Sequence, residues 1–239
     1  MSNRREFLKR AAAGAFGVMG AGFAGSASAA AVKFDKEADV IVVGLGGAGA
    51  ATAITAADNG ASVIVIERQP KDTLRSNTRM SGGIFHCPDK TGDRKALKEY
   101  AKAMFSGENI PGKLEGEQPE VSDGLAQAWA DYTPGLLDWM KGAAFPNFPG
   151  AKECGYQVYK ASYPDRIRPM HKSTWGQPKE ETMHGEAFWQ CLATGVENRK
   201  DKIAVDYETR GRKLVQNDKG EVIGITAEDS KGKQVTFKA

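Results

Sequence analysis

Cysteine is scarce in this sequence and follows no metal or redox pattern. The 239 residues contain three cysteines, Cys87, Cys154 and Cys191, which lie far apart. Without a C-x-x-C or C-x-x-C-H motif, the sequence gives no sign of a zinc site, a redox dithiol or covalently attached haem. The odd, dispersed set predicts three buried or free thiols, although one disulfide is compatible with an oxidising compartment.

A run of about 20 apolar residues, as a membrane-spanning helix needs, is also missing. The nearest stretch, residues 11–24, is short and diluted by glycine. It follows Arg4-Arg5 in a twin-arginine export pattern and precedes the small residues 27–29, Ala-Ser-Ala. We therefore expect residues 1–29 to be a cleaved signal peptide and the protein to be periplasmic, with no membrane span after cleavage. A membrane-anchored N-terminus is the alternative.

The chain has no excess of either charge once that segment is removed. The first 29 residues hold four of the 33 basic residues and one of the 30 acidic residues, which leaves 29 of each. The formal net charge of +3 of the whole sequence is therefore carried by residues 1–29. Because no basic stripe is interleaved with aromatic residues either, the sequence does not indicate nucleic-acid binding.

What the sequence does contain is a strand–turn–helix–strand unit of the dinucleotide-binding kind. The apolar residues 40–43 lead into Gly44-Leu45-Gly46-Gly47-Ala48-Gly49, an alanine-rich helix follows, and the apolar residues 63–66 end at Glu67. In this pattern the first glycine permits the tight turn, the second lets the backbone approach a pyrophosphate, and the third lets helix and strand pack closely. Glu67 can then accept hydrogen bonds from a ribose diol. A purely structural glycine turn is the alternative.

The rest of the chain predicts an α/β fold with a helical middle and strands at the end. Helices are expected over residues 93–105, 123–132, 134–140 and 184–198. Residues 145–178, rich in proline and aromatic residues, are expected to be irregular. Short strands are expected at residues 203–207, 213–215, 221–229 and 235–237, and we interpret this tail as an antiparallel β-meander. We assign residues 35–239 to one Rossmann-like dinucleotide-binding domain with a βαβ start.

Three parts of the chain resemble the FAD domain of the fumarate reductase and succinate dehydrogenase flavoprotein superfamily. They are the unit of residues 39–67, the segment Ser76-Asn77-Thr78-Arg79-Met80-Ser81-Gly82-Gly83, and the meander of residues 207–229. That superfamily includes 3-ketosteroid dehydrogenases and urocanate reductases. The resemblance implies FAD, and it also implies that the sequence ends before the family's capping domain.

The resemblance further implies which residues hold the cofactor. The glycine turn would contact phosphate, Glu67 the ribose, the segment of residues 77–83 the pyrophosphate and the flavin, and the backbone near Gly211 the adenine. Ser76 departs from the glycine found in many members. Because the family's covalent histidine is absent, we expect noncovalent FAD. NAD(P) is the alternative, since Arg68 could meet a 2′-phosphate. The predicted cofactor residues are Gly44, Gly46, Gly47, Ala48, Gly49, Glu67, Arg68, Asn77, Thr78, Ser81, Gly82, Gly83 and Gly211.

Catalytic residues are not identified by the sequence. His86 could face the substrate side of the flavin, and Arg166, Arg168 and His171 could attract a carboxylate, but surface or packing roles are at least as compatible with these positions. The resemblance implies hydride exchange with a CH–CH or C=C bond of a carboxylate or enone. A periplasmic cytochrome c or a quinol-linked carrier would exchange electrons with the protein. A noncatalytic FAD-binding fragment completed by a partner chain, and an NAD(P)-binding dehydrogenase domain, remain as alternatives.

Overall fold

The computed structural model describes residues 32–82, 84–86, 88, 93–106, 123–141, 151–153, 171–174 and 184–239. These residues divide into two compact units. Unit 1 consists of residues 32–81 and 188–239, and unit 2 of the described residues between 82 and 187. The predicted signal peptide lies outside the described residues. The assignment of residues 35–239 to one domain stays a prediction.

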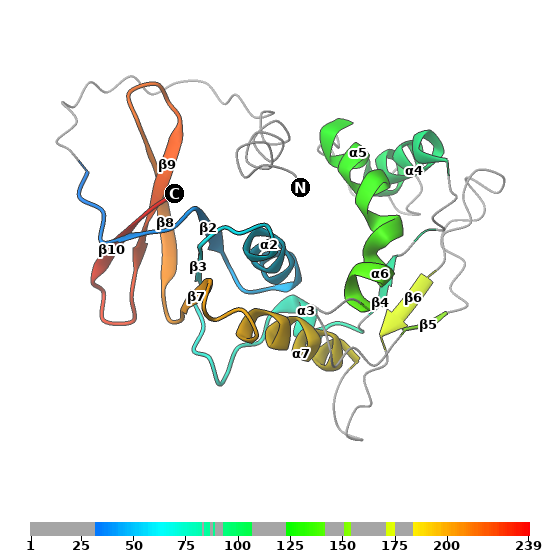
Figure 1. Ribbon diagram of the computed structural model, residues 1–239, viewed down its shortest axis with the longest axis horizontal. Coiled ribbons are helices and arrows are strands. Elements are labelled where there is room, and N and C mark those ends of the chain that lie inside the picture. Colours follow the sequence, from blue (N-terminus) through cyan, green and yellow to red (C-terminus); the bar gives the residue numbers. More distant parts are fainter. Residues whose placement is uncertain are drawn as a thin grey trace, which may run out of the picture. The chain divides into compact units, whose positions relative to one another are not determined.

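A three-stranded parallel sheet forms the centre of unit 1 (Figure 1). Its order is β2 (Val40–Val43), β3 (Val63–Ile66) and β7 (Ile203–Asp206), and Val40 is in register with Val63 and Val63 with Ile203. All four side chains of β3 are buried, as expected for a central strand whose apolar run has no polar alternation. The predicted strands at residues 40–43 and 63–66 are confirmed.

Helix α2 (Gly47–Asp58) connects β2 to β3 and packs on the sheet through small side chains. Ala50, Ala53 and Ile54 are completely buried. The helix ends at Asp58 with Asn59 as its C-cap, and Gly60 follows with a φ of +90°, a backbone conformation that favours glycine. This confirms the predicted βαβ start.

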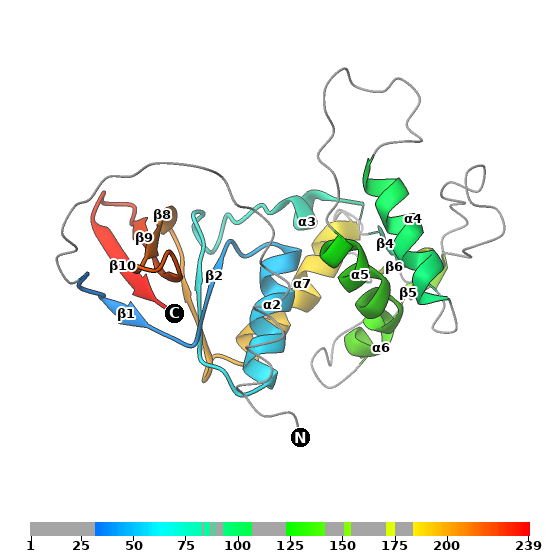
Figure 2. The same cartoon turned by 90° about the horizontal axis from the view of Figure 1, so that it is seen from above.

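An antiparallel sheet lies on the other face of the parallel sheet, so that α2, the parallel sheet and the antiparallel sheet form successive layers (Figure 2). Its order is β1 (Lys36–Glu37), β10 (Gln234–Lys238), β9 (Val222–Glu228) and β8 (Arg210–Gln216), with β1 parallel to β10. The core between the two sheets consists of Ala38, Ile64, Ile66, Ile225, Ala227 and Phe237.

The predicted meander is confirmed for three strands and wrong for the fourth. Residues 203–206 pair in parallel with β3 and so belong to the central sheet. A short apolar strand fits either sheet by composition, and here the buried β3 provides the partner.

Unit 2 contains three of the four predicted helices. They are α4 (Arg94–Ser106), α5 (Asp123–Tyr132) and α6 (Leu136–Lys141), the last entered through a 3-10 turn at Thr133–Gly135. The rings of Tyr100 and Trp129 meet with their centroids 6.0 Å apart and so join α4 to α5. The fourth predicted helix, α7 (His184–Glu197), begins in unit 2 and continues in unit 1.

The prediction that residues 145–178 are irregular is wrong for two short segments. β5 (Ala151–Glu153) and β6 (His171–Thr174) pair with each other, and β6 pairs with β4 (Ile84–His86). These three- and four-residue strands depend on partners far along the chain, which sequence periodicity does not reveal.

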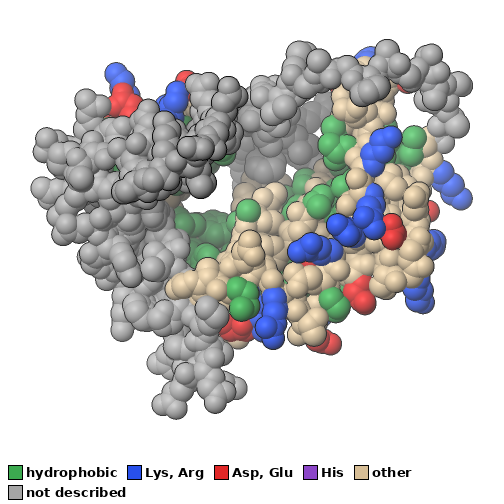
Figure 3. All heavy atoms as spheres, turned by 180° about the vertical axis from the view of Figure 1, so that it is seen from behind, with side chains coloured by type: hydrophobic (Ala, Val, Ile, Leu, Met, Phe, Trp, Pro, Cys, Tyr) green, Lys and Arg blue, Asp and Glu red, His purple; other side chains and the backbone are tan. Residues whose placement is uncertain are grey.

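Over the described residues, no helix combines the length and the apolar character that crossing a membrane requires. In the view of Figure 3, Lys and Arg side chains lie on the surface with a few acidic side chains beside them.

Candidate dinucleotide-binding site

The turn between β2 and α2 can be built only with glycine at two positions. Gly44 has a φ of +91°, which side-chain-bearing residues rarely adopt, and its N–H donates to the Ile66 carbonyl at 2.8 Å. A Cβ on Gly49 would lie 1.9 Å from the Gly44 carbonyl oxygen. The helix therefore starts in close contact with the strand it leaves.

This turn presents open hydrogen-bond donors. In the described part of the chain, the N–H groups of Gly46, Ala48 and Gly49 have no hydrogen-bond acceptor, and no side chain caps the helix at Gly46. The N–H of Gly47 donates to Thr78 Oγ1 at 2.9 Å. Open donors together with the positive end of the helix dipole favour an anion such as a pyrophosphate.

Glu67 lies where the sequence predicts it, at the end of β3, but its environment is more constrained than the sequence indicates. The side chain is only 5% exposed. Its Oε2 accepts the N–H of Leu45 at 2.7 Å, and its Oε1 accepts the N–H of Gln69 at 2.8 Å. The carboxylate thus joins the glycine turn to the loop after β3. Each oxygen retains a second lone pair that can accept a ribose hydroxyl.

The segment from Ser76 to Ser81 lies beside the glycine turn. Ser76 Oγ accepts the N–H of Arg79 at 3.2 Å and caps the short helix α3 (Asn77–Met80). The Ser76 backbone has a φ of −67°, which any residue adopts, so serine fits at this position without strain. Ser81 Oγ donates to the Thr78 carbonyl at 2.8 Å. Asn77 and Gly82 are exposed, while Gly83 lies outside the described residues.

The two remaining cofactor candidates differ in their surroundings. Gly211 borders the carboxyl ends of β2 and β3, because a Cβ there would lie 3.3 Å from Val43 Cγ1 and 3.5 Å from Ile66 Cδ1. Arg68 is exposed and directly follows the buried Glu67. The loop that begins with Arg68 closes where Gln69 Oε1 accepts the N–H of Arg75 at 3.0 Å.

The catalytic candidates are only partly placed. His86 and His171 are paired positions of β4 and β6 in unit 2, so pairing brings together two residues that are far apart in the sequence. Their side chains lie outside the described part. Arg166 and Arg168 lie outside the described residues altogether. All four catalytic assignments stay predictions.

Tyr207 was not predicted as part of the site. It follows β7, and burial first, then the charges of Glu197 and Glu67, raise the pKa of its hydroxyl above 10.0. The next two residues turn back toward β3, since the N–H of Thr209 donates to the Glu67 carbonyl at 2.8 Å and Glu208 has a φ of +52°. The strongly polar sequence of residues 206–210 gave no sign of this contact.

Cys191 is the one cysteine that the structure describes, and it is a buried residue on α7 that is not part of a disulfide. Burial raises the pKa of its thiol above 9.0. This agrees with the prediction of a buried thiol for Cys191, while Cys87 and Cys154 lie outside the described residues.

Comparison with known proteins identifies the family, because residues 39–239 match the FAD binding domain family. The chain belongs to this family. Its cofactor is therefore FAD, as predicted, and the Rossmann-like fold is confirmed by the solved structures that resemble it. The turn fits the cofactor on structural grounds too, since the three open N–H groups and the buried Glu67 match a pyrophosphate and a ribose.

The relatives are flavoenzymes of different specificity. The chain is 28% identical over 189 residues to a fumarate reductase (cytochrome) of Shewanella frigidimarina, covering 78% of this chain and 29% of the relative. It is 40% identical over 113 residues to the acrylate reductase flavoprotein subunit of Shewanella woodyi, covering 46% and 22%. A 3-ketosteroid delta1-dehydrogenase structure from Sterolibacterium denitrificans superposes with a TM-score of 0.63 at 16% identity, covering 85% of this chain and 46% of that one. The chain thus spans less than a third of the length of these two reductases.

Proposed function

We propose that this chain forms the FAD-binding part of an oxidoreductase of the fumarate reductase type. Its substrate is a carboxylate or an enone that contains a CH–CH or C=C bond. The substrate class rests on the relatives, which include reductases of fumarate and acrylate and steroid dehydrogenases. The FAD site rests on the chain's own residues.

The observation that carries the proposal is the glycine turn with its three open N–H groups above a buried acid. Gly46, Ala48 and Gly49 would donate to the pyrophosphate, and Glu67 would accept from the adenosine ribose. Thr78 Oγ1 accepts the Gly47 N–H, so its own proton is available for a phosphate oxygen. We propose that FAD binds noncovalently, because the sequence has no histidine at the position that carries covalent FAD in some members of the family.

When bound, FAD supplies hydride exchange at its ring, which is the hard step of making or reducing a C=C bond. The residues described here bind and orient the cofactor. A cytochrome c or quinol-linked carrier in the periplasm would exchange electrons with the enzyme, as the cytochrome-linked relative suggests.

FAD binding is tested by titrating the purified, flavin-free chain with FAD and following flavin fluorescence. We expect saturable binding of one FAD per chain. Thr78→Val should raise the dissociation constant about tenfold, since it removes one charge-assisted hydrogen bond and leaves the Gly47 N–H without an acceptor. Thr52→Val is the matched control, because Thr52 is an exposed residue of α2 that bonds only to the Ala48 carbonyl. Absence of FAD binding by the folded parent chain would contradict the proposal.

Turnover separates an enzyme from a binding fragment. Fumarate, acrylate and a steroid enone are each supplied with reduced viologen to the FAD-loaded chain. Oxidation of the viologen that depends on one substrate supports catalysis by this chain. FAD binding without turnover on any of them identifies the chain as a binding unit that needs further residues.

We also propose export to the periplasm by the twin-arginine route, on the basis of residues 1–29. Replacing both arginines, Arg4→Lys and Arg5→Lys, should keep the full-length precursor in the cytoplasm, whereas the parent chain should appear shortened in the periplasmic fraction. Equal export of both proteins would exclude this route.

A further inference from the structure

The glycine turn is held from two directions by residues of one short segment. Leu45 donates its N–H to Glu67 Oε2 at 2.7 Å. Gly47 donates its N–H to Thr78 Oγ1 at 2.9 Å. Glu67 is buried directly after the central strand β3, whereas Thr78 lies on the four-residue helix α3, which is too short to be stable by itself. The position of Thr78 therefore depends on the loop that leads to α3.

The fit between α3 and the turn is close. A Cβ on Gly47 would lie 2.8 Å from Thr78 Oγ1 and 3.2 Å from Thr78 Cγ2. A Cβ on Gly46 would lie 4.0 Å from Ser76 Cβ. A displacement of α3 by about 1 Å would lengthen the bond from the Gly47 N–H to Thr78 beyond the usual range of roughly 2.7–3.2 Å. The hydroxyl that we assign to the pyrophosphate thus needs a precisely held support.

The side chain of Gln69 ties the two ends of this loop together. Its Oε1 accepts the N–H of Arg75 at 3.0 Å, and its Nε2 donates to the Arg75 carbonyl at 3.5 Å. The carboxamide thus binds both backbone polar groups of one residue, as a neighbouring strand would. Arg75 directly precedes Ser76, the residue that caps α3. One glutamine side chain therefore holds the chain at the point where it enters α3.

The backbone of Gln69 is itself fixed at the end of the central sheet. Its N–H donates to Glu67 Oε1 at 2.8 Å, and its carbonyl accepts the N–H of Glu208 at 3.3 Å. Pro70 follows and restricts Gln69 to extended conformations. The side chain of Gln69 is therefore presented to Arg75 from a rigid base.

The far end of the loop is joined to α3. The Arg79 guanidinium donates from Nη1 to the Leu74 carbonyl at 2.6 Å, so a restraint on Arg75 also restrains Thr78. The Leu74 side chain is only 2% exposed, and its burial holds this end of the loop against the interior. Apolar burial is not directional, however, and the hydrogen bonds from Gln69 supply the direction.

We propose that Gln69 is a positioning residue for the FAD pyrophosphate. Its carboxamide holds Arg75 so that Thr78 accepts the Gly47 N–H and presents its own proton to a phosphate oxygen. This inference rests on the FAD site proposed above. A methionine at position 69 has a similar length but no donor or acceptor for the Arg75 backbone. The loop of residues 70–75 then adopts several conformations, and FAD affinity falls with the fraction of chains in which Thr78 lies on the turn.

Amide hydrogen exchange in the flavin-free chain tests the support directly. The amides of Leu45 and Gly47 belong to one turn but are held by Glu67 and Thr78 respectively, so Leu45 is an internal control. We expect Gln69→Met to speed the exchange of Gly47 about fivefold, as for the loss of one neutral hydrogen bond, and to leave Leu45 unchanged. Gln69→Glu keeps an acceptor for the Arg75 N–H and should leave both amides close to their rates in the parent chain. The amide of Val65, in β3, reports that the sheet is folded in each variant.

FAD titration then tests whether Gln69 acts through Thr78. Gln69→Met should raise the dissociation constant about fivefold in the parent chain. In the Thr78→Val background it should raise the constant less than about twofold, because the hydroxyl that it positions is already absent. Gln234→Met makes the same chemical change at an exposed residue of β10 and should leave FAD binding and both exchange rates unchanged.

Three results would overturn the proposal. The first is unchanged Gly47 exchange in a folded Gln69→Met variant, and the second is equal acceleration of Leu45 and Gly47, which would indicate general loosening of the turn. The third is the same increase in the dissociation constant in both backgrounds. Failure of the parent chain to bind FAD would instead contradict the proposed function, whereas the exchange measurement judges the role of Gln69 without flavin.

Discussion

The Glu67 carboxylate accepts the Leu45 N–H at 2.7 Å, so the side chain that ends β3 holds the turn that follows β2. Its other oxygen accepts the Gln69 N–H. A glutamine at this position offers one carbonyl oxygen and one NH2 group, and the NH2 group would face a backbone donor in either orientation. The fold of the turn therefore requires the anion, because both carboxylate oxygens accept a backbone N–H.

We expect Glu67→Gln to lower the free energy of unfolding by about 1–3 kcal/mol, because it leaves a buried N–H without an acceptor. It should also weaken FAD binding, since the turn and the ribose contact change together. Urea unfolding and FAD titration measure the two effects. Glu208→Gln makes the same chemical change on an exposed side chain and should leave both values unchanged. Equal stability of Glu67→Gln and the parent chain would show that the turn does not depend on the carboxylate.

Gly49 provides the second test of the turn. An alanine there would place Cβ 1.9 Å from the Gly44 carbonyl oxygen, which is backbone and cannot rotate away. We expect Gly49→Ala to lower the free energy of unfolding by roughly 3 kcal/mol, which is at the upper end of the effects of overpacking. We also expect it to abolish FAD binding. In Gly124→Ala the new Cβ on α5 has no atom within 4 Å, so stability should be unchanged or rise by up to about 1 kcal/mol. Thermal unfolding followed by circular dichroism compares the two variants, and similar melting temperatures would contradict the close contact.

The predictable part of this structure is the part encoded by local pattern. The residues from Val40 to Glu67 combine apolar runs, glycines and a terminal acid in an order that few other structures require. The Asn59-Gly60 helix end is equally local. Pairing partners are not local, so local pattern does not show that residues 203–206 join the central sheet or that β4, β5 and β6 pair with one another. The bonds from Glu67 to Leu45 and Gln69 also depend on the loop after β3 meeting the glycine turn, so sequence reasoning located the acid but not its structural role.

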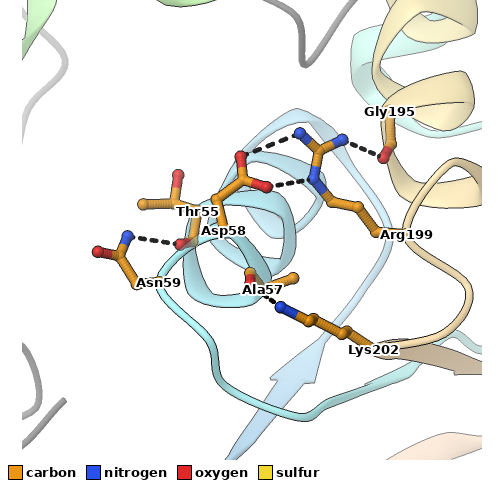
Figure 4. Close-up of polar contacts among 7 residues, drawn as sticks. All are labelled: Thr55, Ala57, Asp58, Asn59, Gly195, Arg199 and Lys202. Atoms are coloured by element: carbon orange, nitrogen blue, oxygen red, sulfur yellow. Dashed lines mark hydrogen bonds and ion pairs between the residues drawn. The ribbon is translucent and has the colours of Figure 1, made fainter.

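The carboxyl end of α2 is tied to the residues after α7 by a bidentate ion pair (Figure 4). Arg199 Nε and Nη2 donate to the two Asp58 oxygens at 2.6 and 2.9 Å, and Nη1 donates to the Gly195 carbonyl at 2.7 Å. The Arg199 side chain is 15% exposed and that of Asp58 is 44% exposed, so solvent screens the pair only partly.

We therefore expect Arg199→Met to lower the free energy of unfolding by about 1 kcal/mol. A double-mutant cycle with Asp58→Asn should give a coupling energy of about 0.5–1 kcal/mol that decreases in 1 M salt. Arg212→Met breaks a more exposed ion pair with Glu228 and should lower the free energy of unfolding by less than Arg199→Met does. A coupling energy of zero at low salt would show that the two side chains act independently.

Tyr207 makes stability depend on pH in the alkaline range. Burial, with smaller effects from Glu197 and Glu67, raises the pKa of its hydroxyl above 10.0 in the folded chain. In the unfolded chain the hydroxyl loses its proton near pH 10. Between these two pKa values the unfolded state binds fewer protons than the folded state, so the free energy of unfolding falls as pH rises above about 10. Below that pH the group is protonated in both states and contributes no pH dependence.

The stability difference between the parent chain and Tyr207→Phe isolates this effect from the titration of the lysines. We expect the difference to be constant from pH 8 to about 9.5 and then to move in favour of Tyr207→Phe up to pH 11, because phenylalanine cannot ionise. Tyr132→Phe, at a side chain that is 79% exposed, should show no such trend. Urea unfolding at half-unit pH steps gives all three curves. Parallel curves for the parent chain and Tyr207→Phe across this range would contradict this prediction. They would mean that the Tyr207 hydroxyl is solvated in the folded chain. The backbone turn at residues 207–209 would then be more open than the hydrogen bond between Thr209 and Glu67 indicates.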